Sequence, residues 1–240
     1  MAPRILIVTP TYDERENLEP FLAGAFEALP EAHVLVVDDN SPDGTGDLAD
    51  SIAAEDPRVQ VMHRPGKLGL GSAYLDAFRW GLERDYEIIL EMDTDLSHDP
   101  RYLPDFIQAI EDGAGVVIGS RNVPGGGVEG WGLGRHVLSK GGSLYSRSIL
   151  GLSVRDLTSG YKAFRADVLR AISLDEVHSE GYSFQIELTY RSLRKGFRVQ
   201  EVPIIFVDRR AGESKMSRKI FAEAIMMVWK LRFDALTGKF

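Results

Sequence analysis

The chain has 240 residues, a formal net charge of −8 and no cysteine. Its length and its 44% hydrophobic residues suit one α/β domain with a full-sized core. The lack of cysteine excludes disulfides, thiolate metal sites and cysteine nucleophiles, and the acidic balance argues against general nucleic-acid binding. We find neither a signal peptide nor a stretch of the about 18 apolar residues that a membrane span requires, so we expect a soluble or peripheral protein.

Short runs rich in β-branched residues predict strands at residues 5–8, 34–37, 59–62, 86–92, 116–118 and 199–207. Between them, apolar residues at three- and four-residue spacing predict helices at 14–29, 44–54, 69–84 and 100–111. Alternating strands and helices are typical of a mostly parallel sheet, and continuously apolar strands indicate helices on both faces. The sequence therefore predicts an open α/β sheet in a single domain.

Polar residues follow several of these strands. Ligands of open α/β sheets bind at the carboxyl ends of the strands, so these residues are candidates for a site. Asp39 follows the second predicted strand, Asp93 and Asp95 follow the fourth, and Arg121 follows the fifth. The glycine-rich segment after Arg121, residues 123–134, suits either a mobile lid or a plain surface connection.

The Asp93-x-Asp95 pair suggests a metal site. Two carboxylates at a strand end leave Mg²⁺ or Mn²⁺ open positions for phosphate oxygens. The pattern alone is weak, because acidic clusters also form turns and helix caps, and Asp99 before Pro100 is placed to cap a helix. Glu91 receives no role. Glycine fingerprints of dehydrogenases and P-loop enzymes are missing, and residues 66–71 suit a turn and a tight helix start.

Seven blocks in consistent order connect the chain with a known family. They are TPTYDERENL, VVDDNSPDGT, MDTDLSHDP, GSRNVPGGGVEGW, DLTSGYKAFR, GYSFQIEL and FVDRRAGESK. Together they resemble the dolichyl- and polyprenyl-phosphate mannosyltransferases of the inverting glycosyltransferase family 2. The resemblance covers nearly the whole chain. It implies a GT-A-type, Rossmann-like fold, with a catalytic domain at residues 1–215 and a C-terminal amphipathic helix at 216–240.

The resemblance also implies a site. The residues matching those that hold GDP-mannose are Pro10, Tyr12, Glu14, Val37, Asp39, Asp93, Thr94, Asp95, Arg209 and Lys215. Asp93 and Asp95 would hold Mg²⁺ or Mn²⁺ and, with Arg121, would be the catalytic residues. The residues matching those that contact the acceptor phosphate are Arg121, Arg135 and Ser139. Ser97 stands where family members often carry a metal-proximal glutamine, which leaves the metal preference open.

The implied reaction is transfer of mannose from GDP-mannose to a polyprenyl phosphate, with inversion. The acceptor phosphate is already an anion near neutral pH, so no general base is required. Three alternatives remain open. In the first, the donor is UDP-glucose. In the second, the Asp-x-Asp pair belongs to a haloacid-dehalogenase-type phosphatase. In the third, the chain binds sugar nucleotides without catalysis.

The C-terminal end differs in charge from the acidic body. Residues 209–240 contain eight Lys or Arg against three Asp or Glu. Residues 219–233 carry apolar side chains at helical spacing, including Val228 or Trp229, with flanking basic residues. Such a helix either lies in a membrane interface or packs on the sheet. We expect the partner to be a membrane surface or a separate membrane subunit, on the cytoplasmic face.

Overall fold

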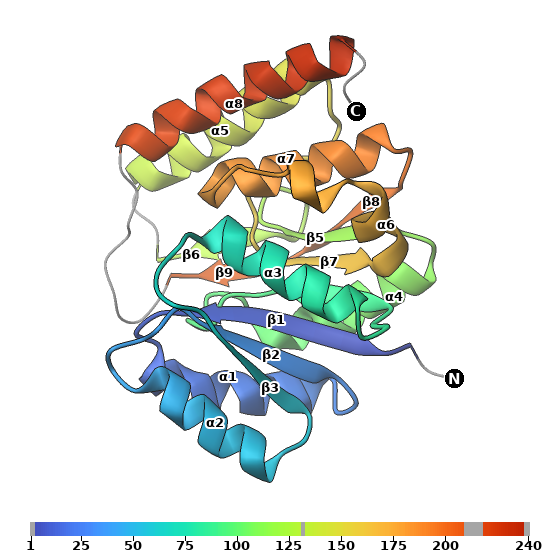
Figure 1. Cartoon of the computed structure of the whole chain (residues 1–240). Coiled ribbons are helices and arrows are strands. Elements are labelled where there is room, and N and C mark those ends of the chain that lie inside the picture. The colour runs from blue at the N-terminus through green and yellow to red at the C-terminus, as the bar shows by residue number, and fades with distance from the viewer. Residues whose placement is uncertain (1–2, 131–132, 209–217, 238–240) are drawn as a thin grey trace.

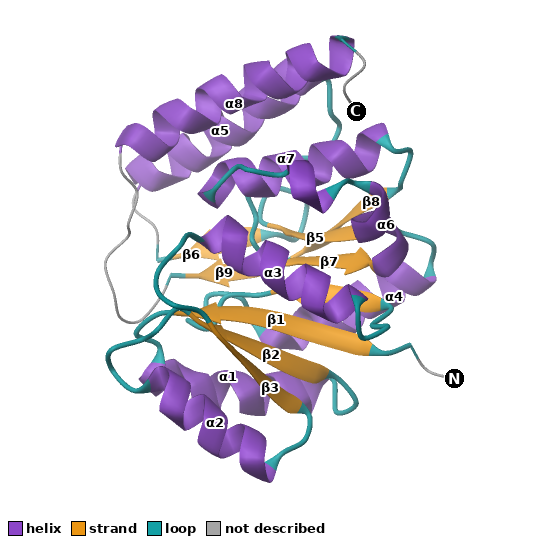
Figure 2. Cartoon of the chain, viewed as in Figure 1, coloured by secondary structure: helices purple, strands orange, loops and turns teal. Residues whose placement is uncertain are grey.

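The structure is a computed structural model that describes residues 3–130, 133–208 and 218–237, without the side chains of 133–138 and 218–225. A seven-stranded sheet of order β3-β2-β1-β4-β7-β5-β8 forms its centre (Figure 1, Figure 2). Its strands are β1 (Ile5–Thr11), β2 (His33–Asp38), β3 (Val59–His63), β4 (Ile88–Glu91), β5 (Val116–Ser120), β7 (Lys162–Arg165) and β8 (Val199–Pro203). A second, two-stranded parallel sheet pairs β6 (Gly127–Glu129) with β9 (Ile205–Val207).

Helices cover both faces of the main sheet. One face carries α1 (Arg15–Ala28), α2 (Thr45–Glu55) and α4 (Leu103–Glu111), the last preceded by the 3-10 turn η1 (Pro100–Tyr102). The other carries α3 (Leu70–Leu82), α6 (Ala166–Ala171), the 3-10 turn η2 (Leu174–Glu176) and α7 (Gly181–Arg194). Outside α7, α5 (Leu133–Leu150) and α8 (Arg218–Leu236) run side by side, far from α1 and α2 (Figure 1).

The predicted mostly parallel sheet is confirmed, and all six predicted strand regions contain strands. The prediction of one strand at 199–207 was wrong, because the chain leaves the main sheet at Ile204. The Ile204 backbone N–H donates to Ser120 O at 3.1 Å, whereas its carbonyl accepts from the Gly127 N–H of β6 at 2.9 Å. One residue therefore joins two sheets. The glycine-rich segment also contributes β6, which the sequence analysis missed.

The strand order fixes where a ligand can bind. From β3 to β4 the four neighbouring strands are parallel, and the order of connection reverses between β1 and β4. Such a reversal opens a crevice at the carboxyl ends of the two strands, where doubly wound proteins bind ligands. Beyond β4, the unpredicted strand β7 runs antiparallel to both of its neighbours, β4 and β5.

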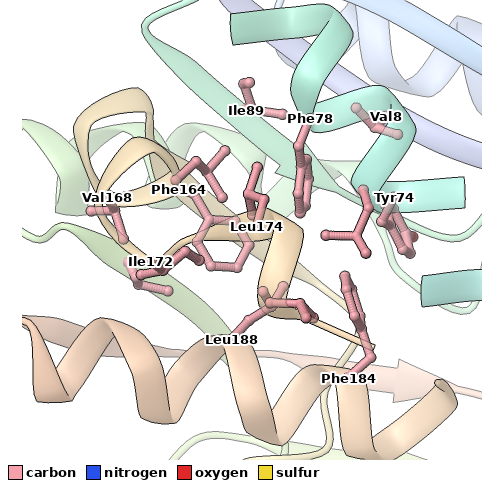
Figure 3. Packing of buried hydrophobic residues seen from close by; sticks show 14 of the residues in the cluster. Val8, Tyr74, Phe78, Ile89, Phe164, Val168, Ile172, Leu174, Phe184 and Leu188 are labelled. Atoms are coloured by element: carbon pink, nitrogen blue, oxygen red, sulfur yellow. The ribbon is translucent and has the colours of Figure 1, made fainter. Parts of the chain in front are cut away.

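Buried side chains alternate between the two faces of the sheet. Figure 3 shows the cluster beneath α3 and α7, where Phe78 meets Phe164 edge-on at 5.7 Å between ring centroids and Tyr74 stacks on Phe184 at 6.1 Å. Each buried aromatic side chain removes a large apolar area from water, which makes it a main source of stability. On this face the core also takes in α8, through Val228 and Leu231.

The C-terminal helix is apolar on more than one side, yet it is no membrane span. Among the residues that the structure describes, no helix is both long and apolar enough to cross a bilayer. The structure decides between Val228 and Trp229, which the sequence analysis left open as members of the apolar face, because the two side chains point in different directions. Val228 is 1% exposed and Trp229 is 58% exposed. Successive helical residues are about 100° apart, which explains the separation.

A close backbone approach predicts that α3 tolerates no added methyl group at Gly71. A Cβ there would lie 2.6 Å from Ser179 O, which belongs to the backbone and cannot rotate away. We expect Gly71→Ala to lower the free energy of unfolding by about 1–2 kcal/mol, although alanine favours the helix itself. Urea unfolding measures this change in the free energy of unfolding. The control is Gly66→Ala, whose Cβ would meet no atom within 4 Å, and equal stability of the two variants would contradict the prediction.

Candidate active site

The carboxyl ends of β1 and β4 are joined through two threonines. The hydroxyl oxygens of Thr9 and Thr94 are 2.6 Å apart, and the Thr94 hydroxyl also lies 3.3 Å from Pro10 O. Both threonines are buried. The junction therefore places Asp93 and Asp95 directly beside the end of β1, at the crevice that the strand order opens.

Backbone contacts fix the carboxylate turn, residues 93–97. The Asp93 N–H donates to His98 Nδ1 at 3.2 Å, and the Ser97 N–H donates to Asp95 Oδ1 at 3.0 Å. The His98 ring is buried against Tyr161, with 5.1 Å between ring centroids. The Asp93 side chain nevertheless stays 39% exposed. Hydrogen bonds thus hold the turn, while the Asp93 carboxylate is partly exposed at its surface.

Three carboxyl groups, those of Glu91, Asp93 and Asp95, follow one another along the chain at the end of β4. Burial raises the pKa of Tyr74 well above its usual value, and the charges of Asp93, Glu91 and Asp95 add to the rise. All three carboxyl groups therefore lie near the same buried hydroxyl. Like charges this close repel, and a bound cation would relieve the repulsion.

The next strand end presents Asp39, which is paired with Arg64. Arg64 Nη1 lies 2.6 Å from Asp39 Oδ1, both residues are buried, and Arg64 Nη2 donates to Ser72 at 2.6 Å. Burial raises the pKa of Asp39, and the neighbouring Arg64 charge opposes the rise. Val37, predicted to contact the nucleotide, is fully buried within β2. Asp39 is therefore fixed in place by a partner to which the sequence analysis gave no role.

The residues after β1 complete this side of the crevice. The Lys67 ammonium lies 3.9 Å from the centroid of the Tyr12 ring, a cation-π distance. Glu14 accepts a hydrogen bond from Asn17 Nδ2 at 2.7 Å, and its N–H donates to Thr45 Oγ1 at 3.1 Å. The predicted donor residues of β1, β2 and β4 thus meet at one edge of the sheet. Arg209 and Lys215 lie outside the described residues.

Arg121 follows β5 and forms a buried ion pair with Asp156. Asp156 accepts from Arg121 Nε and Nη2, each at 2.7 Å, and from the Arg121 backbone N–H at 3.0 Å. Burial acts to raise the pKa of Asp156, but the charge and hydrogen bonds of Arg121 outweigh it and hold the pKa below its usual range. Such a bidentate pair fixes the guanidinium plane firmly.

The other two predicted acceptor residues lie on α5. Ser139 is half-buried there, and Arg135 belongs to the same helix one turn earlier, with its side chain outside the description. Residues four apart on a helix share a face. The structure thus places the predicted donor residues that it describes at neighbouring strand ends but leaves the predicted acceptor residues on separate elements.

The carboxylate turn fits a hard divalent cation. Mg²⁺ and Mn²⁺ prefer carboxylate and phosphate oxygens, and Asp93 and Asp95 supply the first kind. Within residues 3–130, 133–208 and 218–237, no group of three or more His, Asp or Glu is arranged for a metal. Ser97 is buried, and within the described structure its hydroxyl has no hydrogen-bond partner. Asp99, predicted as a cap, accepts from the Arg101 N–H at 2.9 Å.

Three residues that the sequence analysis did not assign take part in this architecture. Arg64 stands at a strand end, Asp156 lies in the block DLTSGYKAFR, and His98 lies in MDTDLSHDP. The signal for each was its position in a motif or after a strand. The sequence did not reveal the residues that these three contact, because Arg64 pairs with Asp39, Asp156 pairs with Arg121, and His98 stacks on Tyr161 only in the folded chain.

The chain matches the family described as "Glycosyl transferase family 2" over residues 6–173. The chain belongs to glycosyl transferase family 2. Curated relatives extend over nearly its whole length. It is 54% identical to an undecaprenyl-phosphate mannosyltransferase of Micrococcus luteus over 98% of both chains. It is 51% identical to a polyprenol monophosphomannose synthase of Mycolicibacterium smegmatis over 95% of this chain and 88% of the relative.

Solved structures share the fold of this glycosyltransferase. A mannosyltransferase from Pyrobaculum calidifontis in complex with GDP-Man and Mn²⁺ matches 99% of this chain and 75% of its own, with a TM-score of 0.60 and 16% identity. A glucosyl-3-phosphoglycerate synthase from Mycobacterium tuberculosis, bound to Mn²⁺ and UDP-glucose, matches 96% of this chain and 79% of its own, with a TM-score of 0.66 and 18% identity. The predicted GT-A-type fold is confirmed, and family membership overrules the phosphatase alternative.

The buried pair predicts a pH-dependent contribution to stability. Asp156→Asn leaves the buried Arg121 charge without its counter-charge, so at pH 7 we expect a loss of about 3 kcal/mol in the free energy of unfolding. The folded-state pKa of Asp156 is depressed. Its contribution is therefore present above the unfolded value of about 3.9 and disappears as the pH falls through the folded pKa.

Denaturant unfolding between pH 7 and pH 3 measures this contribution. The difference in stability between the wild type and Asp156→Asn should be constant near neutral pH and should begin to shrink as the pH falls toward and below the unfolded pKa of about 3.9. Asp167→Asn is the control, since Asp167 pairs with Arg165 at the surface, with 49% of its side chain exposed. An exposed pair contributes little, so the control should match the wild type at pH 7. A difference between wild type and Asp156→Asn that stays constant with pH would refute the assignment.

Proposed function

We propose that this glycosyltransferase transfers mannose from GDP-mannose to a polyprenyl phosphate, giving polyprenyl-phosphate β-mannose and GDP. The observation that carries the proposal is the 54% identity, over 98% of both chains, to an enzyme named for mannosyl transfer to undecaprenyl phosphate. The site supports it, because the described residues supply hard oxygen ligands at the carboxylate turn and a fixed guanidinium at Arg121. Transfer between two phosphate-bearing substrates requires positive charge at each phosphate, and a cation on the carboxylate turn and the Arg121 guanidinium would supply it.

The donor is proposed to bind across the carboxyl ends of β1, β2 and β4. Tyr12 and Glu14 after β1, with Asp39 after β2, would bind the nucleoside. The carboxylate turn would face the diphosphate, and Arg209 and Lys215 would close over it. Asp39 suits this role because Arg64 holds it in one orientation before the ligand arrives. A preoriented carboxylate binds hydroxyl and amine groups without losing side-chain entropy at that moment.

Asp93 and Asp95 would hold the divalent cation, Mg²⁺ or Mn²⁺. When bound, such a cation stabilises the negative charge that develops on a departing nucleoside diphosphate. The Mn²⁺ found with GDP-Man in the Pyrobaculum calidifontis mannosyltransferase supports this proposal. The Asp93 N–H donates to His98 Nδ1 and the Asp95 carboxylate accepts from the Ser97 N–H, so binding would require little rearrangement of the turn.

The acceptor phosphate is proposed to meet Arg121, Arg135 and Ser139. Because a polyprenyl phosphate is already ionised, it attacks the sugar without losing a proton, and no residue has to act as a base. Asp156 offsets the charge of Arg121 and fixes its orientation, so Arg121 would orient the phosphate while Arg135 adds net positive charge. Attack from the side opposite the leaving GDP inverts the anomeric carbon.

A donor panel with a carboxylate variant tests the function. Purified protein is incubated with Mn²⁺ or Mg²⁺, a short polyprenyl phosphate and either GDP-mannose or UDP-glucose, and lipid-linked sugar is measured. We expect transfer from GDP-mannose. In Asp95→Ala we expect at least a thousandfold loss of transfer with an unchanged melting temperature, because the diphosphate charge loses its stabilisation.

Asp99→Ala is the matched control, because Asp99 is a nearby aspartate that caps η1. Loss of a cap costs about 1 kcal/mol of stability and should leave turnover intact. Transfer from UDP-glucose but not from GDP-mannose would overturn the donor assignment. Full activity of Asp95→Ala would overturn the role of the carboxylate turn.

We further propose that residues 216–240 bind the surface of a membrane, on its cytoplasmic face. Four large apolar side chains of α8, Met226, Trp229, Phe233 and Leu236, are between 58% and 72% exposed. Their spacing places them on one stripe of the helix. Leu144 of the adjacent α5 is 60% exposed as well, and Lys140 and Lys230 are exposed basic residues on the same two helices. Apolar side chains beside basic ones are typical of helices that lie in a lipid interface.

Vesicle flotation tests this surface. We expect the wild type to float with vesicles of phosphatidylcholine and phosphatidylglycerol, and the double variant Trp229→Gln, Phe233→Gln to lose at least tenfold in binding, because each side chain contributes about 1.5–3 kcal/mol when buried in lipid. Leu68→Gln is the control, since Leu68 is 59% exposed but lies outside α5 and α8. Deleting 216–240 is unsuitable, because Val228 and Leu231 belong to the core. Unchanged flotation of the double variant would refute the proposal.

A further inference from the structure

A lysine and a glutamate face each other inside the main sheet. Lys162 of β7 lies opposite Glu91 of β4, and also opposite Ile118 of β5. Both charged residues are completely buried. Alternation along the strands puts them on the side of Ile89 and Phe164, beneath α3 and α7 (Figure 3). No role proposed so far uses either residue.

Gln185 of α7 holds the lysine ammonium. Lys162 Nζ donates to the Gln185 side-chain oxygen and to the Gln185 backbone oxygen, both at 2.7 Å. Gln185 also influences Glu91. Burial raises the pKa of Glu91 to about 8, and the nearby Lys162 charge and the Gln185 amide oppose the rise. A residue of α7 thus holds the ammonium group of β7 in place.

Lys162 is also electrostatically coupled to the ion pair at the end of β5. Burial lowers the pKa of Lys162 to about 8, while the charges of Glu91 and Asp156 raise it and that of Arg121 lowers it. Glu91 lies two residues before Asp93, at the end of β4. Lys162 therefore stands between the strand that carries the carboxylate turn and the strand that carries Arg121.

Stability alone does not account for this arrangement. Buried charges lose their hydration, and replacing a buried ion pair by apolar residues of similar volume is often neutral or stabilising. Within the described structure, both Glu91 carboxyl oxygens and the Gln185 amide nitrogen lack a partner at hydrogen-bond distance. A core built only for stability would fill this space with aliphatic side chains, as the rest of the cluster does.

We propose that Lys162, held by Gln185, is a positioning residue. It fixes β7 between β4 and β5, so that Asp93 and Arg121 keep the relative placement that transfer requires. The inference rests on the proposed function, in which these two residues serve the donor and the acceptor. Small misalignments of two reactants reduce the reaction rate by up to about a hundredfold, so a residue that keeps the two strand ends aligned would raise the rate of transfer.

The test compares Lys162→Met, Gln185→Met and the double variant with the wild type. We expect each single variant to lose at least tenfold in kcat, with the KM for GDP-mannose changed by less than threefold. Because both residues act through one unit, the double variant should be no slower than the slower single variant. If Lys162→Met fails to fold, the double variant Glu91→Met/Lys162→Met takes its place, because it removes both buried charges and keeps the side-chain volume.

Backbone hydrogen exchange of the ligand-free protein gives a readout that does not depend on transfer. The Asp93 and Arg121 amides donate to His98 and Asp156. Both should exchange at least tenfold faster in Lys162→Met and Gln185→Met. The matched control is Arg191→Met, which removes another buried cation of α7, one paired with Glu187 at 2.8 Å and in contact with Ile172 O and Glu176. It should lower stability without altering kcat or these two exchange rates.

Unchanged exchange at both amides, or a kcat within twofold of the wild type, would overturn the positioning role. A wild type that fails to transfer mannose would instead overturn the proposed function, and the exchange comparison would still decide the role of Lys162. Additive losses in the double variant would show that Lys162 and Gln185 act separately, which also contradicts the proposal.

Discussion

The contact between Thr9 and Thr94 joins the carboxyl ends of β1 and β4, and the rest of the site depends on that junction. Parallel strands end at the same edge of a sheet, but only neighbouring strands bring their ends within hydrogen-bond distance. The strand order makes β1 and β4 neighbours although about 80 residues separate them. The carboxylate turn can therefore meet residues of the N-terminal strand without any flexible connection.

The second half of the site depends on an antiparallel strand. β7 enters the sheet between β4 and β5 and moves the end of β5, with Arg121, one strand away from the carboxylate turn. This spacing separates the carboxylates of the proposed donor side from a guanidinium that is held by Asp156. Two substrates that both carry phosphate repel each other, so separate binding elements of different charge are a physical requirement for bringing them together.

The helix pair α5 and α8 connects the core with the surface. α8 contributes Val228 and Leu231 to the interior and turns Trp229 and Phe233 outward. A helix that is apolar on two opposite sides needs a second apolar environment besides the core. Because α5 also carries Ser139, the same pair would place an acceptor contact beside a lipid surface.

The sequence by itself determined the α/β class, the strand ends on which the site is built, the Asp99 cap and the family, because these depend on local periodicity and on contiguous motifs. The tertiary structure alone decided the insertion of β7, the division of 199–207 between two sheets, and the partners of Asp39 and Arg121. It also decided that Glu91 is buried opposite Lys162. These features depend on contacts between residues far apart in the chain, and a four-residue strand such as β7, with a lysine and an arginine in it, has too little apolar periodicity to be recognised before its neighbours are known.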